Sequence, residues 1–302
     1  MTTPEGASES RRGLAYGIAA YGLWGIIPLF WKLLAHVDPI EVLAHRVLWG
    51  MLTFMVIVGL AGRTAPLRAA LRERRTIGVM ALSGTALAVN WGVFIGAVTY
   101  DRLLDASLGY FINPLVSVAL GTIVLREKLR RLQWIAIVCA LVGVIVLTVQ
   151  LGRVPWISLV LAGSFGLYGL LRKTARVDSL VGSTIETTLM LPVALVWLVW
   201  LAAQGGGELG RVGAVEHLLL ISTGVITAGP LLLFTSAARR LPLATVGFLQ
   251  YLAPTGQFLL AVFVFGEPFA RAQLLAFGFI WIGLLVFSLD LWRTQQAAAQ
   301  GQ

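Results

Sequence analysis

The chain is a succession of apolar blocks separated by short polar connections. Each block holds about 20 mostly apolar residues, the length of α-helix that crosses ~30 Å of hydrocarbon. The pattern therefore predicts ten membrane-spanning helices, and the connections are too short to hold a soluble domain. The predicted helices cover residues 14–34, 40–61, 77–99, 103–125, 132–150, 154–172, 179–203, 216–238, 243–266 and 270–291.

The composition predicts that lipid surrounds these helices. The 302 residues are 58% hydrophobic and 12% charged, whereas a soluble domain carries about 25% charged residues. Because so few charged residues cannot cover a water-exposed surface of this size, we expect the lipid bilayer to be a partner of the chain. The first apolar run follows Arg11-Arg12, as in a signal peptide. It is longer than the roughly 7–15 residues of a signal core and has no clear cleavage site, so we expect a retained helix.

Positive charge is distributed unevenly along the chain. A net charge of +9 is compatible with nucleic-acid binding, but membrane proteins also concentrate Lys and Arg on the cytoplasmic side. With the N-terminus placed inside, most of the 23 Lys and Arg residues fall on that same side. This asymmetry predicts an even number of spans and no nucleic-acid partner. Residues 1–12 and 293–302 are then expected to be disordered cytoplasmic tails.

The second half of the chain echoes the first. "FINPLVSV" is followed 140 residues later by "YLAPTGQF", which aligns Pro114 with Pro254. Residues 13–150 and 151–292 are therefore predicted to be two five-helix repeats. Because five is odd, the second repeat must enter the membrane in the opposite sense. The predicted fold is an all-α membrane protein with inverted 5+5 repeats, a recurring plan of secondary transporters that places the substrate near the midplane between the halves.

An Asn-Pro pair lies near the centre of the fourth predicted helix. Asn113 is about 15 Å deep at roughly 1.5 Å per residue, and Pro114 frees the backbone carbonyl of Tyr110. In one interpretation the proline kinks the helix and presents Asn113 and the Tyr110 carbonyl to the substrate. In the other, Asn113 bonds to a neighbouring helix and the kink serves packing.

Two further polar and aromatic pairs extend this substrate pathway. Gln250 and Tyr251 precede Pro254, the matching kink of the ninth predicted helix, and can bind a polar group and stack on a ring. Asn90 and Trp91 lie in the middle of the third. The alternatives are an interhelical hydrogen bond for Gln250, an interfacial ring for Tyr251, and packing or lipid contact for Trp91.

Glu186 is the one acidic residue well inside a predicted span. An ionisable group at this depth usually serves function or has a partner, so Glu186 is a candidate for coupling transport to a proton gradient. The alternative is a salt bridge or hydrogen bond to Arg172 or Lys173, with the basic side chain extending toward the surface.

Arg46 lies in the outer part of the second predicted helix. It can anchor an anionic group of the substrate, or it can extend outward to the membrane surface. Glu41 and His45 share another face of the same helix, and we interpret them as gate or rim residues.

Two glutamates occupy matching ends of the repeated helices. Glu127 and Glu267 are predicted to be structural caps or gate residues, each paired in a helix with the arginine four positions on, Arg131 and Arg271. Chemical motifs are otherwise sparse. A single cysteine excludes an internal disulfide, and no Cys/His cluster or nucleotide-binding motif is present, so we expect no metal and no cofactor.

Several segments resemble RarD proteins, which are EamA-type members of the drug/metabolite transporter superfamily. They are the stretch 105–131, "LAHRVLWG" (43–50), "NWGVFIGAV" (90–98), "SFGLYGLLRK" (164–173), "IETTLMLPVA" (185–194) and "GFLQYLAPT" (247–255). The resemblance covers roughly residues 12–292. It implies a ten-helix permease of small metabolites or drugs in the bacterial inner membrane, and this family carries a chloramphenicol-sensitivity label.

The predicted function is secondary transport of a small molecule by alternating access. An enzyme is not expected, because no catalytic motif is found. A membrane sensor or scaffold with the same fold is the alternative, although its signal output would usually need a soluble domain. The sequence leaves open the substrate, the direction, the coupling ion, and the choice between monomer and homodimer.

Overall fold

The structure is a computed structural model that describes residues 4–100, 102–207, 213–264, 266 and 271–300. Helices account for nearly all of this part of the chain, and it contains no strand. The helices are α1 (Pro4–Ile26), α2 (Pro28–Leu33), α3 (Pro39–Leu60), α4 (Thr64–Arg72), α5 (Arg74–Thr99), α6 (Leu103–Ile123), α7 (Arg131–Leu151), α8 (Trp156–Thr174), α9 (Ser179–Ala203), α10 (Ala214–Arg240), α11 (Leu243–Gln250), α12 (Leu252–Phe263) and α13 (Arg271–Gln300).

Local sequence explains several helix boundaries. Asp38 caps α3 by accepting hydrogen bonds from the backbone amides of Ile40 and Glu41, which fill donor sites that the helix cannot satisfy itself. Asp178 caps α9 in the same way through the amide of Val181. Gly152 ends α7 with φ +68°, a left-handed conformation that favours glycine.

Eight helices in the described ranges are long and apolar enough to cross a membrane. They correspond to eight of the ten predicted blocks. The sixth block is α8, which packs against α5 and α6 and carries Arg172 and Lys173 in its last turn. The ninth block is divided at Tyr251 into α11 and α12.

Other departures from the predicted pattern are local. The first block breaks at Ile27, directly before Pro28, into α1 and α2, because proline disfavours a helical conformation in the residue before it. The connection after α3 contains the short helix α4. Residues 4–12 and 293–300 are helical, where the sequence predicted disordered tails.

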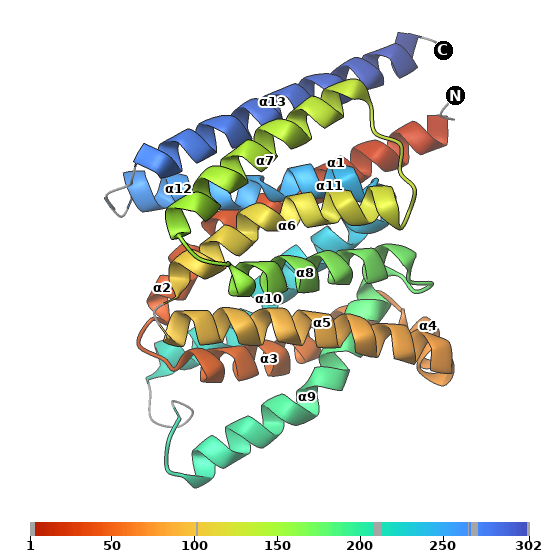
Figure 1. Cartoon of the computed structure of the whole chain (residues 1–302). Helices are drawn as coiled ribbons and strands as arrows, with labels where there is room; N and C mark the ends of the chain where they lie inside the picture. Colours follow the sequence, from red (N-terminus) through yellow and green to blue (C-terminus); the bar gives the residue numbers. More distant parts are fainter. Residues whose placement is uncertain (1–3, 101, 208–212, 265, 267–270, 301–302) are drawn as a thin grey trace.

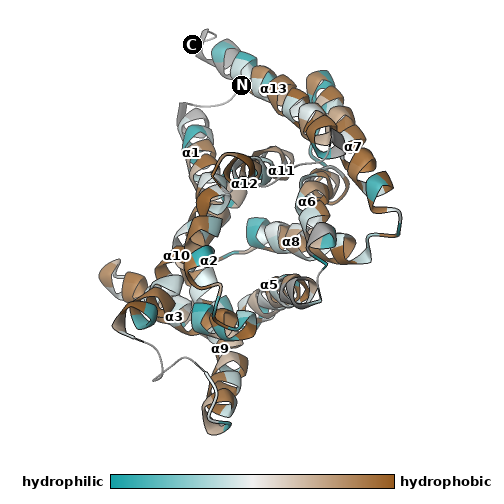
Figure 2. Ribbon diagram, turned by 90° about the vertical axis from the view of Figure 1, so that its left-hand side faces the viewer, coloured by the Kyte–Doolittle hydropathy of each residue, from teal (hydrophilic) through white to brown (hydrophobic). Residues whose placement is uncertain are grey.

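The long helices form a bundle in which α7 and α13 lie together at one edge and α9 at the opposite edge (Figure 1). α1 begins and α13 ends on the same side of the bundle. Seen roughly end-on, most helices carry hydrophobic surface (Figure 2). Large apolar side chains such as Val56, Ile145 and Val196 are exposed, as expected where lipid replaces water. The chain is a multi-pass membrane protein.

Several contacts between helices occur twice, once for a helix of the first half of the chain and once for the corresponding helix of the second half. α1 packs against α10 and α12, and α8 packs against α5 and α6. α3 packs against α10, and α9 packs against α5. The pairs α3–α9, α6–α11 and α7–α13 join the first half of the chain to the second.

The α7–α13 contact is reciprocal. A Cβ added to Gly143 would lie 2.8 Å from the carbonyl oxygen of Ala276, and one added to Gly283 would lie 2.9 Å from that of Ala136. The two glycines are 140 positions apart in the sequence, and so are the two alanines. Each helix therefore uses the same small residue to approach the same carbonyl of the other.

Candidate functional site

Arg46 on α3 lies between two tryptophans. Its guanidinium carbon is 4.9 Å from the ring centroid of Trp31 on α2 and 4.6 Å from that of Trp91 on α5. Its Nε donates a hydrogen bond to Thr227 Oγ1 on α10 at 3.2 Å. Four helices thus hold one cation, and both tryptophan contacts are within the range of cation–π attraction.

Tyr110 on α6 belongs to the same group of residues. It lies within electrostatic range of Arg46, and its ring lies 6.0 Å from that of Phe94 on α5. The side chain is 39% exposed although it lies in a membrane-crossing helix. The structure therefore brings together three of the predicted pathway residues: Arg46, Trp91 and Tyr110. Trp31 and Thr227 were not predicted, because neither shows a local pattern that points to Arg46.

The other predicted pathway residues of α6 and α11 lie where these two helices cross. Gln250 Nε2 donates to Ser117 Oγ at 3.1 Å, and the Tyr251 hydroxyl donates to the Phe111 carbonyl at 3.2 Å. Asn113 Oδ1 is buried and has no hydrogen-bond partner among the described residues. Tyr251 is 1% exposed, so in this conformation it joins helices and is not available for stacking on a ligand.

The two predicted proline kinks differ. α6 runs through Pro114 as one helix, while Pro254 follows the break between α11 and α12. A Cβ on Gly247 would lie 2.7 Å from the Pro114 carbonyl oxygen. α11 therefore approaches α6 closely at the proline, and Gly247 permits that approach.

Asn90 connects α5 to α8. Its Nδ2 donates to the Leu161 carbonyl at 2.8 Å and to Ser164 Oγ at 3.1 Å. The amide is thus engaged in a contact between α5 and α8, which the sequence did not predict.

Glu186 on α9 is fully buried, as is Arg172 on α8. Glu186 Oε1 lies 3.4 Å from Arg172 Nη1 and accepts a hydrogen bond from Ser83 Oγ at 2.5 Å. Arg172 Nη2 donates to the Ser179 carbonyl at 3.0 Å. A Cβ on Gly182 would lie 1.9 Å from Arg172 Nη1, so only glycine leaves room for the guanidinium. Arg172 is the predicted partner of Glu186, but it does not extend to the surface.

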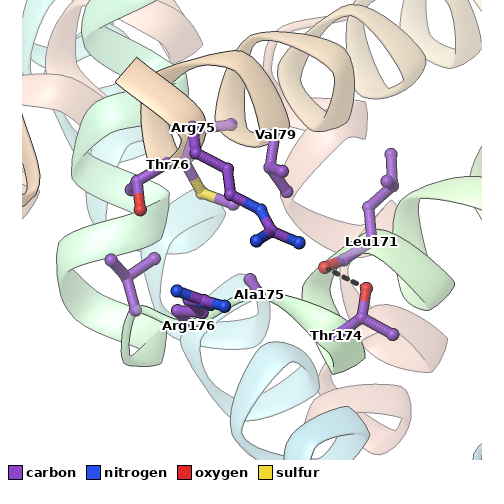
Figure 3. Close-up of a pocket in the computed structure, with 9 residues that line it drawn as sticks. Arg75, Thr76, Val79, Leu171, Thr174, Ala175 and Arg176 are labelled. Atoms are coloured by element: carbon purple, nitrogen blue, oxygen red, sulfur yellow. Dashed lines mark hydrogen bonds between the residues drawn. The ribbon is translucent and has the colours of Figure 1, made fainter. Parts of the chain in front are cut away.

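A pocket of about 170 Å³ opens between the start of α5 and the end of α8 (Figure 3). Arg75 and Arg176 are among its basic lining residues, and Met80 contributes to its wall. Met80 Sδ is 3.2 Å from Arg172 Nη1. The pocket wall is thus in direct contact with the buried Arg172–Glu186 pair.

Glu41 and His45 form the predicted group on α3. Glu41 Oε1 is 3.8 Å from His45 Nε2, and Trp49 Nε1 donates to His45 Nδ1 at 3.2 Å. Both the glutamate and the histidine are buried. The two partners of His45 thus lie on its own helix, one turn before it and one turn after it.

Glu127 binds the first turn of α11. Its Oε1 and Oε2 accept hydrogen bonds from the amides of Leu243 at 2.7 Å and Ala244 at 3.0 Å, and Lys173 Nζ is 3.9 Å away. α11 has no side-chain cap of its own, so Glu127 provides one from the other half of the chain. The predicted helical pair with Arg131 is wrong, because α6 ends at Ile123. Glu267 lies outside the described residues.

Comparison with known proteins supplies the family. Residues 11–149 match the EamA-like transporter family. Protein RarD of Streptomyces exfoliatus is 44% identical over 291 residues, covering 95% of this chain and 91% of that protein. Protein RarD of Escherichia coli K12 is 41% identical over 294 residues, covering 97% and 99%. The chain is a RarD-type member of the EamA family.

Two other comparisons concern one further relative of this RarD-type chain and one solved structure. The chloramphenicol-sensitive protein RarD of Pseudomonas aeruginosa is 33% identical over 285 residues, covering 93% of this chain and 95% of that protein. A solved crystal structure shares the fold with a TM-score of 0.71 at 19% identity, covering 92% of this chain and 97% of that chain. The described part of this RarD-type protein contains no cluster of His, Cys, Asp and Glu that would hold a metal.

Proposed function

We propose that the protein is a secondary transporter that moves a small metabolite or drug-like molecule across the bacterial inner membrane by alternating access. In this proposal ten helices form two inverted five-helix repeats, with both termini in the cytoplasm. α8 is the sixth span, and α11 with α12 is the ninth. The relatives named RarD and the EamA-like transporter family support the class of function.

The reciprocal contact between α7 and α13 is the observation that carries the inverted-repeat proposal. In a two-fold contact, residue i touches j and the counterpart of j touches the counterpart of i. Gly143 with Ala276, and Gly283 with Ala136, fit this rule at the offset of the sequence repeat. Two such halves can rock against each other around a site between them.

We further propose that Glu186 couples transport to protons. Protonation of Glu186 would remove the counter-charge of Arg172, and an uncompensated buried charge is strongly unfavourable. The helices α5, α8 and α9, which hold the pair, would then rearrange. The pocket in Figure 3 lies beside the pair, because Met80 in its wall contacts Arg172.

Flux through proteoliposomes tests the proposal. Purified protein is reconstituted, and chloramphenicol and a panel of radiolabelled organic acids and amines are offered with and without a pH gradient. We expect saturable flux of at least one compound, which protein-free liposomes lack. For coupling, Glu186→Gln is expected to retain binding but lose the dependence of flux on the pH gradient. A sensor or scaffold would move none of the compounds, and an unchanged pH response of Glu186→Gln would remove the coupling role.

A further inference from the structure

Arg46 has an unusual environment for a cation in a membrane-crossing helix. A charged side chain at such a position is costly and usually faces a carboxylate or a functional cavity. Among the described residues, no carboxylate lies within salt-bridge distance of Arg46, and its only hydrogen bond is the one from Nε to Thr227. The terminal nitrogens Nη1 and Nη2 therefore have donor hydrogens without a protein acceptor in this part of the chain.

The aromatic neighbours determine which side of the guanidinium remains available. Trp31 and Trp91 have their ring centroids within 5 Å of its carbon and attract its positive charge. They accept no ordinary hydrogen bond from the two Nη groups, which form the planar fork that matches a carboxylate. Arg46 itself is only partly buried.

The side chains around Arg46 are aromatic and partly exposed. Tyr110 lies within electrostatic range of Arg46 and is 39% exposed. Phe94 packs against the Tyr110 ring. A ligand whose charged group binds Arg46 would therefore place the rest of its body against aromatic side chains.

We propose that Arg46 binds the carboxylate of the transported substrate and that Trp31, Trp91 and Tyr110 contact its apolar ring. The substrate class is a small aromatic monocarboxylate. The inference rests on the proposed transport function and names the chemistry of its substrate. Binding of the carboxylate would supply the counter-charge that the described residues do not, which gives discrimination against uncharged analogues.

Calorimetric binding to the purified full chain in detergent tests this proposal independently of transport. The probes are benzoate, naphthoate and indoleacetate, each paired with its neutral amide of nearly the same shape. We expect at least one carboxylate to bind at least about tenfold more tightly than its amide, as a charge-assisted hydrogen bond implies. Absence of binding by every carboxylate, or equal binding of acids and amides, would overturn the proposal.

Variants locate the effect at Arg46. Arg46→Gln is expected to lose at least about tenfold in carboxylate affinity while amide binding changes little. Arg46→Lys keeps the charge without the planar fork, and its carboxylate affinity is expected to lie between those of wild type and Arg46→Gln. Lys32→Gln removes a positive charge from an exposed side chain next to Trp31 and should bind like wild type. Equal losses in Arg46→Gln and Lys32→Gln would reveal general charge attraction and contradict a built site.

The thermal unfolding curve of each variant shows that it is folded before binding is compared. If Arg46→Gln fails to fold, Arg46→Lys and Thr227→Val carry the test, because each alters the carboxylate fork or its anchor while keeping a positive charge. Carboxylate binding without flux in proteoliposomes would contradict transport and leave the binding site standing. Flux of neutral compounds without carboxylate binding would support transport and contradict the carboxylate site.

Discussion

Two arginines in the helices of this protein have opposite environments. Arg172 is fully buried and paired with Glu186, and it has further partners in Met80 and Ser179. Arg46 is partly exposed, lies between two tryptophan rings, and has no described carboxylate near it. The comparison teaches that arginines in the helices of one protein can differ in whether the protein supplies their counter-charge. Arg172, whose counter-charge comes from Glu186, joins helices, and the ligand site proposed at Arg46 rests on the absence of such a partner among the described residues.

The largest expected effect comes from breaking the paired arginine. Arg172→Ala leaves Glu186 as an uncompensated buried charge, and such a loss typically costs about 3–5 kcal/mol. We expect low yield and a strongly lowered melting temperature in detergent. The double variant Arg172→Met with Glu186→Leu should recover most of the stability, because apolar replacement of both partners removes the unpaired charge. A single variant as stable as wild type would show that the pair does not hold the helices.

The next largest effect is expected at Gly182, which lies against the guanidinium of Arg172. Gly182→Ala places a methyl group 1.9 Å from the present position of Arg172 Nη1, so the guanidinium must move away from Glu186. We expect a loss of about 1–3 kcal/mol, as for other overpacked interiors. Gly163→Ala on α8 is the matched control, since a Cβ there meets no atom within 4 Å. Equal melting temperatures of the two variants would contradict the close packing around Arg172.

A smaller effect on stability is expected at the unpaired arginine. Arg46→Gln loses two cation–π contacts, each worth about 0.5–1 kcal/mol at exposed sites, and also removes a charge that has no described counter-charge. These effects oppose each other, so the melting temperature should stay close to that of wild type. A drop as large as that of Arg172→Ala would mean that Arg46 is a structural residue too.

The smallest effect concerns a third arginine, Arg63, which forms an exposed ion pair with Asp178 at the start of α9. Burial raises the pKa of Asp178, but hydrogen bonds from Val181 and Arg63 outweigh it and hold that pKa below the usual value. The lowered pKa means that the pair stabilises the fold above the ordinary aspartate pKa of about 3.9 and loses this contribution as the pH falls through the folded-state value.

The variant Arg63→Gln measures this contribution. Because both side chains are substantially exposed, solvent screens the pair and we expect a loss of only about 0.2–1 kcal/mol at pH ~7. The difference from wild type should shrink as the pH falls through the lowered folded-state pKa of Asp178 and its carboxylate becomes protonated. A difference that is independent of pH would show that Arg63 acts through packing and not through its charge.

The sequence predicted the helical membrane class well, because long apolar blocks are a strong signal. It predicted the kink at Pro254 but not the complete division of the ninth block three residues earlier, at Tyr251. Nor did it predict the contact of Glu127 with α11, because that contact joins residues 116 and 117 positions apart.

The candidate site was predictable only in part. Arg46 and Trp91 stood out as a charged and an aromatic residue inside predicted spans, and Tyr110 stood out for the carbonyl that Pro114 frees. The structure places the three near one another. Trp31 and Thr227 were missed because their role depends on how α2 and α10 pack against α3. For Glu186 and Arg172, the sequence suggested the pair, but only the packing at Gly182 shows why Arg172 stays buried.

Ligand-induced stabilisation of two variants tests most directly whether Arg46 binds the ligand while Arg172 holds the helices together. The shift in melting temperature on adding the tightest-binding aromatic carboxylate is measured for wild type, Arg46→Gln, and Arg172→Met with Glu186→Leu. A ligand that binds the folded state raises its stability by an amount that grows with the logarithm of the ligand concentration divided by Kd. We predict that Arg46→Gln melts near wild type without a ligand shift, while the double variant keeps the shift. A full shift in Arg46→Gln, or its loss in a folded double variant, would contradict this division of roles.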